Sequence, residues 1–328
     1  MGEMGMRNSR KRNKKKWYQR NQWFKSIFSF ILGGIFVFCT LCYEEVIPFI
    51  NSYIQKFIQD EARKTDIIIS YIDVGQADAT LVQNNGYNLL IDTGNREDGE
   101  TIETYLKQCG VSKLDGVILT HWHEDHIGGF SYIAQKYEIE QVYIRRNVNK
   151  VGTKVYEDTR EAIKEKKIKT IVPSHGETVN FGQAEIKFVG PVNPNHYEDE
   201  NANSLCMILS YGKTKFYFGG DSTKEAETDI LESGYDLEEI DVYKVSHHGS
   251  SYSSSYRFIR EISGGDKRTK PFYAIVSCGK NNDYGHPHKE TIDRLQQADA
   301  MVYRTDLLGT IMCYSNGLDI KFAHNKKE

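Results

Sequence analysis

Short runs of Ile, Val, Tyr and Phe alternate with segments of helical periodicity from Asp66 to the end of the chain. The runs predict strands, and apolar residues three and four positions apart predict helices. Early strands follow one another as hairpins, whereas helices separate the later ones. This order predicts an α+β fold, an αββα sandwich in which two mixed sheets carry helices on their outer faces. The predicted strands span 67–72, 79–83, 87–91, 115–120, 140–144, 169–172, 184–189, 204–211, 214–218, 241–245, 272–277, 300–303, 308–314 and 317–322, and the predicted helices span 100–108, 127–137, 157–166, 223–232 and 288–297.

The beginning of the chain follows a different pattern. Residues 1–26 hold nine Lys or Arg and one acid, and the 17 residues of 27–43, IFSFILGGIFVFCTLCY, are uncharged. This run is long enough to cross a bilayer core, so we expect one N-terminal transmembrane helix. Because Lys and Arg stay on the cytoplasmic side, we predict a cytoplasmic tail (1–26), a stalk (44–65) and an extracytoplasmic domain (66–328) in a single-pass protein of the cell membrane. A cleaved signal peptide is the alternative, although no A-x-A-like pattern follows the apolar run.

Composition indicates a well-packed core and an acidic outer domain. The chain has 328 residues, of which 39% are hydrophobic and 12% aromatic, enough for one large domain. Its net charge is −3, and subtracting the +8 of residues 1–26 leaves −11 for residues 27–328. The four cysteines downstream of residue 43 form no C-x-x-C pair, which argues against a cysteine zinc knuckle and a dense disulfide framework. A single bridge among them stays open.

Candidate chemistry concentrates where the predicted strand 115–120 ends, in the sequence HWHEDHIGG (121–129). In an extended loop, residues i and i+2 point the same way, so His121 and His123 can face one metal ion. Asp125 and His126, at the turn into the following helix, can then face a second. Imidazole and carboxylate groups are ligands of Zn²⁺, so their density in this loop predicts a metal site.

This loop resembles the H-x-H-x-D-H signature of the metallo-β-lactamase superfamily, which implies two divalent metal ions, Zn²⁺ or Mn²⁺. By this resemblance, Asp92 in LLIDTGN would orient the histidine loop through hydrogen bonds. Asp221 in FYFGGDST would bridge both metals, and His247 in VYKVSHHGS would complete the second site. His248 is expected to contact the substrate, although either neighbouring histidine could be the ligand. Asp92, Asp125 and His248 are the predicted catalytic residues.

A narrower resemblance rests on IDVGQADA (72–79), SHHGS (246–250), YGHPH (284–288) and VYRTDLLGTI (302–311). Together these motifs are similar to the soluble hydrolase domain of ComEC-type competence proteins and their stand-alone relatives, over roughly residues 66–322. The resemblance implies a turn near the metals at Gly75 and Gln76. It also implies a cleft rim that bears His286, His288 and Arg304. Ser250, His286 and His288 are the candidates for substrate contact.

One segment departs from the superfamily pattern. Where another histidine usually completes the first metal site, the chain reads NANSLCMIL (201–209). Asn203 or Ser204 stands in its place, as in ComEC-like domains, and both are poor zinc ligands, so we assign them to substrate binding. The first site, with His121, His123 and Asp221, is therefore expected to be the weaker one. His196 nearby is a further candidate ligand.

These features predict an enzyme that hydrolyses esters with a water activated between two metals. No G-x-S-x-G elbow or phosphate-binding P-loop is present, which argues against a serine hydrolase and a nucleoside triphosphatase. The resemblance implies phosphodiesters, including DNA, but a charge of −11 disfavours nucleic acid unless basic clusters at 143–154 and 163–170 offset it. Two alternatives stay open: a cell-envelope ester hydrolase, such as a teichoic-acid phosphocholine esterase, and a non-catalytic metal-binding surface module.

Overall fold

A computed structural model describes residues 66–146, 152–194, 196–235, 237 and 239–326. The predicted tail, transmembrane helix and stalk all lie outside these residues. In the described part of the chain, no helix combines the length and the apolarity that crossing a membrane requires.

Two mixed sheets contain the predicted strands. The first has the order β17-β16-β1-β2-β3-β5-β7-β8, and the second has the order β15-β14-β13-β12-β11-β10-β9. Neighbours from β3 to β8 are parallel in the first sheet, and neighbours from β12 to β15 are parallel in the second. The strands of the first sheet are β1 (Ile67–Tyr71), β2 (Thr80–Asn84), β3 (Tyr87–Ile91), β5 (Gly116–Leu119), β7 (Gln141–Ile144), β8 (Lys169–Ile171), β16 (Ile311–Ser315) and β17 (Ile320–His324). Those of the second are β9 (Thr178–Phe181), β10 (Ala184–Gly190), β11 (Cys206–Tyr211), β12 (Thr214–Phe218), β13 (Val242–Lys244), β14 (Phe272–Val276) and β15 (Ala300–Arg304), and β4 (Lys113–Leu114) pairs with β6 (Glu138–Ile139).

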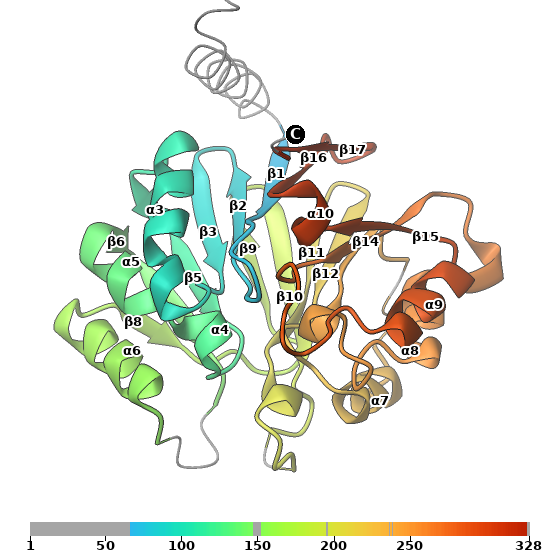
Figure 1. The fold of residues 1–328 in the computed structure, drawn as a ribbon, viewed down its shortest axis with the longest axis horizontal. Helices are drawn as coiled ribbons and strands as arrows, with labels where there is room; N and C mark the ends of the chain where they lie inside the picture. Colours follow the sequence, from blue (N-terminus) through green and yellow to red (C-terminus); the bar gives the residue numbers. More distant parts are fainter. Residues whose placement is uncertain (1–65, 147–151, 195, 236, 238, 327–328) are drawn as a thin grey trace, which may run out of the picture. The chain divides into compact units, whose positions relative to one another are not determined.

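Helices cover the outer face of each sheet, as Figure 1 shows. One buried apolar cluster lies between the sheets and includes Ile69 of β1 and Phe216 of β12. A second joins the first sheet to α3 and α5, and a third joins the second sheet to α7, α8 and α9. The helices are α3 (Gly99–Gln108), α4 (Glu124–Ile127), α5 (Phe130–Lys136), α6 (Lys154–Glu165), α7 (Lys224–Glu232), α8 (Tyr256–Ile262), α9 (Lys289–Gln297) and α10 (Thr305–Leu308). These layers confirm the predicted α+β sandwich.

The predicted helix 127–137 is divided at Gly128 and Gly129 into α4 and α5. Both glycines lie against the loop that follows β3. A Cβ atom on Gly129 would lie 2.3 Å from the carbonyl oxygen of Thr93, and one on Gly128 would lie 2.5 Å from the amide nitrogen of Arg96. This close approach brings the histidine loop next to Asp92.

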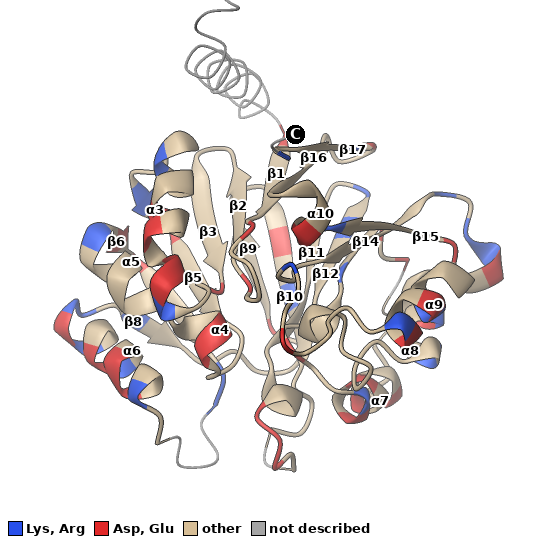
Figure 2. Cartoon of the chain, viewed as in Figure 1, with Lys and Arg blue, Asp and Glu red and all other residues tan. Residues whose placement is uncertain are grey.

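Charged residues of both signs lie on the outer helices, as Figure 2 shows for α6, α7 and α9. Within the predicted basic cluster 143–154, Arg145 is 2% exposed and pairs with Glu200, so it is not available to a polyanion at the surface. Lys164 and Lys166 of the second cluster are exposed, but the acids Glu161 and Glu165 are exposed beside them. Lys167 and Lys169 of the same cluster are exposed as well, so this segment keeps a local basic surface.

Helix α7 contributes one buried acid, Glu227, whose carboxylate accepts the N–H groups of Ser254 (2.5 Å) and Ser255 (2.8 Å). Burial raises the pKa of Glu227 to about 7, and the hydrogen bonds from Ser255 and Ser254 offset this only partly. An acid with a raised folded-state pKa contributes full stability below its unfolded value, here 4.5, and that stability is lost as pH rises through about 7.

We therefore expect wild type to lose on the order of 2–3 kcal/mol relative to Glu227→Gln between pH 4.5 and pH 8. The measurement is urea unfolding of both proteins across this range. Glu225→Gln, on the exposed side of the same helix, is the control and should show no such trend. A stability difference independent of pH would contradict a protonated Glu227 in the folded state.

Candidate metal centre

The candidate site lies where four central strands end. Asp92 follows β3 and His121 follows β5, which is its parallel neighbour. In the second sheet, Asp221 follows β12, and His248 lies shortly after the parallel strand β13. The carboxyl ends of neighbouring parallel strands meet at one edge of a sheet, so residues distant in sequence come together there.

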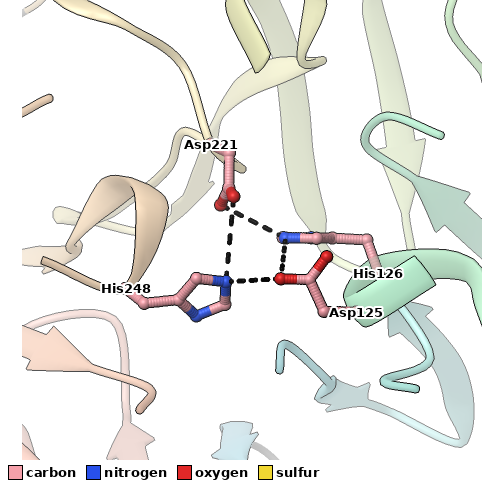
Figure 3. Close-up of side chains that lie close together, drawn as sticks. All are labelled: Asp125, His126, Asp221 and His248. Carbon is pink, nitrogen blue, oxygen red and sulfur yellow. Dashed lines mark hydrogen bonds and ion pairs between the residues drawn. The ribbon is translucent and has the colours of Figure 1, made fainter. Parts of the chain in front are cut away.

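Four side chains, Asp125, His126, Asp221 and His248, converge in Figure 3. Their ligand atoms all lie within 4.8 Å of one another. Nε2 of His126 lies 3.2 Å from Oδ1 of Asp221, and Nε2 of His248 lies 3.2 Å from Oδ2 of Asp125 and 3.7 Å from Oδ2 of Asp221. Asp125 is the most exposed of the four, with 30% of its side chain accessible.

Both histidines of this group turn Nε2 toward the carboxylates because Nδ1 is engaged elsewhere. Nδ1 of His126 donates to Oδ2 of Asp92 at 2.8 Å, and Asp92 also accepts the N–H and hydroxyl of Thr120. Nδ1 of His248 lies 3.0 Å from the carbonyl oxygen of Ser277. A carbonyl can only accept, so Nδ1 carries a proton, and in the neutral ring the lone pair is therefore on Nε2, which faces the carboxylates. Hydrogen bonds of this kind orient the histidine ligands of metals.

The buried polar atoms of the group fit a bound cation. Nε2 of His126 and Oδ1 of Asp221 have no hydrogen-bond partner of adequate geometry among the described residues, although they lie 3.2 Å apart. A buried polar atom without a partner costs free energy. A divalent cation held by both atoms, with Asp125 and His248, would satisfy them.

The pKa shifts within the group also fit a bound cation. Burial alone would raise the pKa of Asp221, but His126, His248 and His247 hold it well below its usual range. Burial alone would lower the pKa of His126, but Asp221, Asp92 and Asp125 raise it well above its usual range. Asp221 and Asp78 outweigh burial in the same way and raise the pKa of His248 to about 9. The negative charge of the buried carboxylates is therefore stabilised by positive charge nearby, which either a bound cation or protonated histidines can supply.

His121 and His123, predicted for the first metal, lie beside the four-residue group. Nε2 of His121 is 3.1 Å from Nδ1 of His123 and 4.0 Å from Oδ2 of Asp221. His121 is fully buried, and burial and the neighbouring His126 lower its pKa well below the usual value. A neutral His121 is suited to coordination, and Asp221, a member of the four-residue group, is within 4.0 Å of its Nε2.

His247, the predicted ligand of the second metal, is less well oriented than His248. Both residues have left-handed backbones, with φ of 52° and 51°. Nε2 of His247 lies 3.7 Å from Oδ2 of Asp221, but its buried Nδ1 has no hydrogen-bond partner in the described structure. The geometry therefore favours His248 as the ligand, a position that the sequence assigned to substrate contact.

Asn203 and Ser204, which the sequence predicts to bind substrate, form hydrogen bonds within the protein. The hydroxyl of Ser204 accepts the N–H of Asp221 at 3.1 Å. The amide of Asn203 donates to the carbonyls of Tyr197 and Asp199, so it holds the local loop. The side chain of His196 is two-thirds exposed, and its Nε2 lies 3.7 Å from Oε1 of Glu225. Among the described residues, His196 does not belong to a group of side chains that could hold a metal ion.

Of the residues predicted for the rim or for substrate contact, His286 and His288 form ring contacts that lead to the site. Ser250 and Arg304 are bonded to residues outside it. His286 stands next to the site, its ring centroid 5.6 Å from that of His247 and 6.2 Å from that of His248. His288 lies against His286, with ring centroids 4.9 Å apart. Ser250 is buried, and its hydroxyl accepts the N–H of Tyr252. Arg304 forms an ion pair with Asp306.

A buried ion pair that the sequence analysis did not predict lies next to His248. Nζ of Lys244 lies 2.8 Å from Oδ2 of Asp78, and both side chains are less than 10% exposed. Oδ1 of Asp78 is 3.6 Å from Nδ1 of His248. Asp78 lies within IDVGQADA and Lys244 within VYKVSHHGS, but neither motif indicates that the two residues form a pair.

Comparison with known proteins gives a family match and individual relatives. Residues 72–268 match the metallo-beta-lactamase superfamily. ComE operon protein 3 of Bacillus subtilis is 29% identical over 261 residues, which cover 74% of this chain and 32% of that protein. Competence protein ComA of Neisseria gonorrhoeae is 26% identical, covering 76% of this chain and 32% of that protein. The chain thus spans about a third of the length of these relatives.

A solved structure agrees at the level of the fold. CmlA, a diiron beta-hydroxylase from Streptomyces venezuelae, has a TM-score of 0.50 at 14% identity, covering 80% of this chain and 54% of CmlA. The match to the superfamily extends over more than half of the chain, and the similarity to competence proteins predicted from four motifs is confirmed. The chain belongs to the metallo-β-lactamase superfamily.

Proposed function

We propose that this chain is a membrane-anchored, extracytoplasmic hydrolase that uses two divalent metal ions to cleave phosphodiesters. The observation that carries the proposal is the convergence of Asp125, His126, Asp221 and His248, with the Nε2 atoms of both histidines turned inward. The anchor is proposed from the basic tail 1–26 and the uncharged run 27–43.

The proposed ligands divide between two cation sites that share Asp221. His126, Asp125, Asp221 and His248 would hold one cation, and His121, His123 and Asp221 would hold the other. When bound, such cations supply an activated water and stabilise charge on the attacked phosphoryl group. This assignment replaces His247 by His248 and leaves His247 for contact with the substrate.

The protein's own residues would orient and protect this chemistry. Asp92 fixes the ring of His126 through the 2.8 Å bond to Nδ1, and the Ser277 carbonyl fixes the ring of His248. The partial exposure of Asp125 leaves a side from which substrate can approach. His121, His126 and Asp221 are each at most 2% exposed, so this part of the site is shielded from water. Electrostatic interactions are stronger in such a low-dielectric setting.

Phosphodiester hydrolysis is tested with full-length protein purified in mild detergent. We expect cleavage of bis(p-nitrophenyl) phosphate and of single-stranded DNA that a chelator abolishes and added Zn²⁺ or Mn²⁺ restores. Asp221→Asn serves as the inactive control. No cleavage of either substrate by protein with a full metal complement would contradict the proposal.

A second candidate, hydrolysis of a cell-envelope ester, is favoured by the charge of −11 on residues 27–328 and by the paired Arg145, which weaken the case for a polyanion. Cleavage of the small ester together with a teichoic-acid phosphocholine ester, but not of DNA, would identify this function.

A further inference from the structure

Gln76 lies in the turn predicted from IDVGQADA, and its amide has one possible orientation. Its Oε1 lies 3.0 Å from the backbone nitrogen of Gly279. A backbone N–H can only donate, so the atom facing Gly279 must be the amide oxygen. The amide nitrogen of Gln76 then faces Nδ1 of His286, at 3.3 Å.

This orientation determines which nitrogen of His286 carries its proton. Because the Gln76 amide nitrogen donates, Nδ1 of His286 must accept and is unprotonated. A neutral imidazole then has its proton on Nε2. No hydrogen bond within the described part of the chain uses Nε2 of His286, so this N–H is available to a ligand.

The position of the His286 ring is fixed from several sides. Asn282 accepts the backbone N–H of His286 at 3.0 Å and donates to its carbonyl at 2.6 Å. The ring stacks between Tyr284 at 5.6 Å and His248 at 6.2 Å, with interplanar angles of 21° and 20°. Stacking fixes the plane of the ring, and the bond from Gln76 fixes its rotation within that plane.

The neighbouring His288 is held in the same tautomer by a different donor. The backbone N–H of Ser251 donates to Nδ1 of His288 at 2.9 Å, so a neutral His288 also has its proton on Nε2. The rings of His286 and His288 lie 4.9 Å apart at 90°. The loop YGHPH therefore holds two imidazoles whose Nε2–H groups are donors.

We infer that Gln76 is a positioning residue that keeps His286 in the Nε2–H tautomer, so that His286, next to the metal centre, donates this N–H to an anionic oxygen of the substrate. The inference rests on the proposed function, because the oxygen it assigns is that of a phosphodiester. The amide nitrogen of Gln76 offers Nδ1 of His286 no acceptor, so this contact selects the ring that has its proton on Nε2. A ring protonated on Nδ1 would present a lone pair and repel the same oxygen.

The tautomer is measured directly by long-range ¹H–¹⁵N correlation NMR on full-length, zinc-loaded protein labelled with ¹⁵N-histidine. The signal that disappears in His286→Gln belongs to His286, and we expect its Nδ1 to be unprotonated and its Nε2 protonated. In Gln76→Glu the amide nitrogen becomes a second acceptor, so Nδ1 of His286 should become protonated. A protonated Nδ1 in wild type, or no change in a folded Gln76→Glu, would overturn the inference. The wild-type spectrum alone decides the matter if Gln76→Glu fails to fold.

A matched pair of substitutions tests the donor role. Glutamine at position 286 can place its amide nitrogen near the site of Nε2, whereas asparagine reaches only the site of Nδ1. For bis(p-nitrophenyl) phosphate, kcat/KM of His286→Asn should fall by about 10²-fold, the usual effect of losing one oxyanion donor. His286→Gln keeps a donor near the position of Nε2, so it should avoid most of this loss. His324→Gln, at an exposed position of β17, is the control. Equal losses in the two variants would contradict an Nε2–H donor.

The two experiments separate this inference from the proposed function. Absence of phosphodiesterase activity with the expected tautomer would overturn the proposed function and the substrate role of His286, while the link between Gln76 and His286 would stand. Activity in a protein whose Nδ1 is protonated would overturn the inference alone.

Discussion

Replacing Asp221 by asparagine is expected to reduce bound metal from near two ions per chain to well below one and to abolish hydrolysis. Asp221 lies between both proposed sites, with Oδ1 at 3.2 Å from His126, and Oδ2 at 3.7 Å from His248 and 4.0 Å from His121. Asparagine keeps the volume of the side chain but offers one neutral oxygen in place of two charged ones. The backbone bond from position 221 to Ser204 does not depend on the side chain, so the fold should persist.

Metal content is measured by mass spectrometry on dialysed protein, together with activity on bis(p-nitrophenyl) phosphate. Asp266→Asn, at a side chain that is 94% exposed, is the matched control and should retain the wild-type metal content and rate. An unchanged metal content in Asp221→Asn would remove this residue from the site. A lowered content together with a collapsed circular dichroism spectrum would indicate a folding role instead.

Much of the fold could be predicted because its central strands are apolar and bounded by turn residues. β3 and β12 coincide with the predicted ranges 87–91 and 214–218. The edge strand β9, TVNF, was missed because only one of its four residues is buried and no apolar run marks it. The predicted strand 308–314 begins only at Ile311, because Thr305–Leu308 form the short helix α10.

Helix α8 was missed for a different reason. It follows the serine-rich segment SSYSSS, which is typical of a loop. Ser255 is in fact the N-cap, its side chain accepting the N–H of Phe258. Phe258, Ile259 and Ile262 then pack into the core beside the second sheet. One serine among several has the capping role, and composition alone does not single it out.

The histidine loop could be predicted because four of its candidate ligands lie within six residues. The choice between His247 and His248 could not, because both have positive φ and the strand rule of alternating side chains does not apply there. What distinguishes them is the Ser277 carbonyl, which lies 29 residues from His248 in sequence. The Asp78–Lys244 pair spans 166 residues, and no local pattern reports such a contact.

Replacing Lys244 by methionine is expected to destabilise the protein by about 3–5 kcal/mol, the cost of removing one partner of a buried ion pair. Asp78 would remain as a buried carboxylate, 7% exposed, whose 2.8 Å partner is gone. Methionine keeps most of the volume of lysine, so a loss of packing contributes little. For a domain of this size, the midpoint of thermal unfolding should fall on the order of 10 °C.

A double-mutant cycle separates the charge from the packing. In Asp78→Asn/Lys244→Met neither buried charge remains, so the double variant should recover more than half of the stability lost in Lys244→Met. Lys107→Met, at an exposed lysine that pairs with Glu103, should change stability by less than about 1 kcal/mol. The pair would have no stabilising role if Lys244→Met unfolded at the wild-type temperature. If the double variant were as unstable as Lys244→Met, the loss would come from packing, and the uncompensated carboxylate beside His248 would not be its cause.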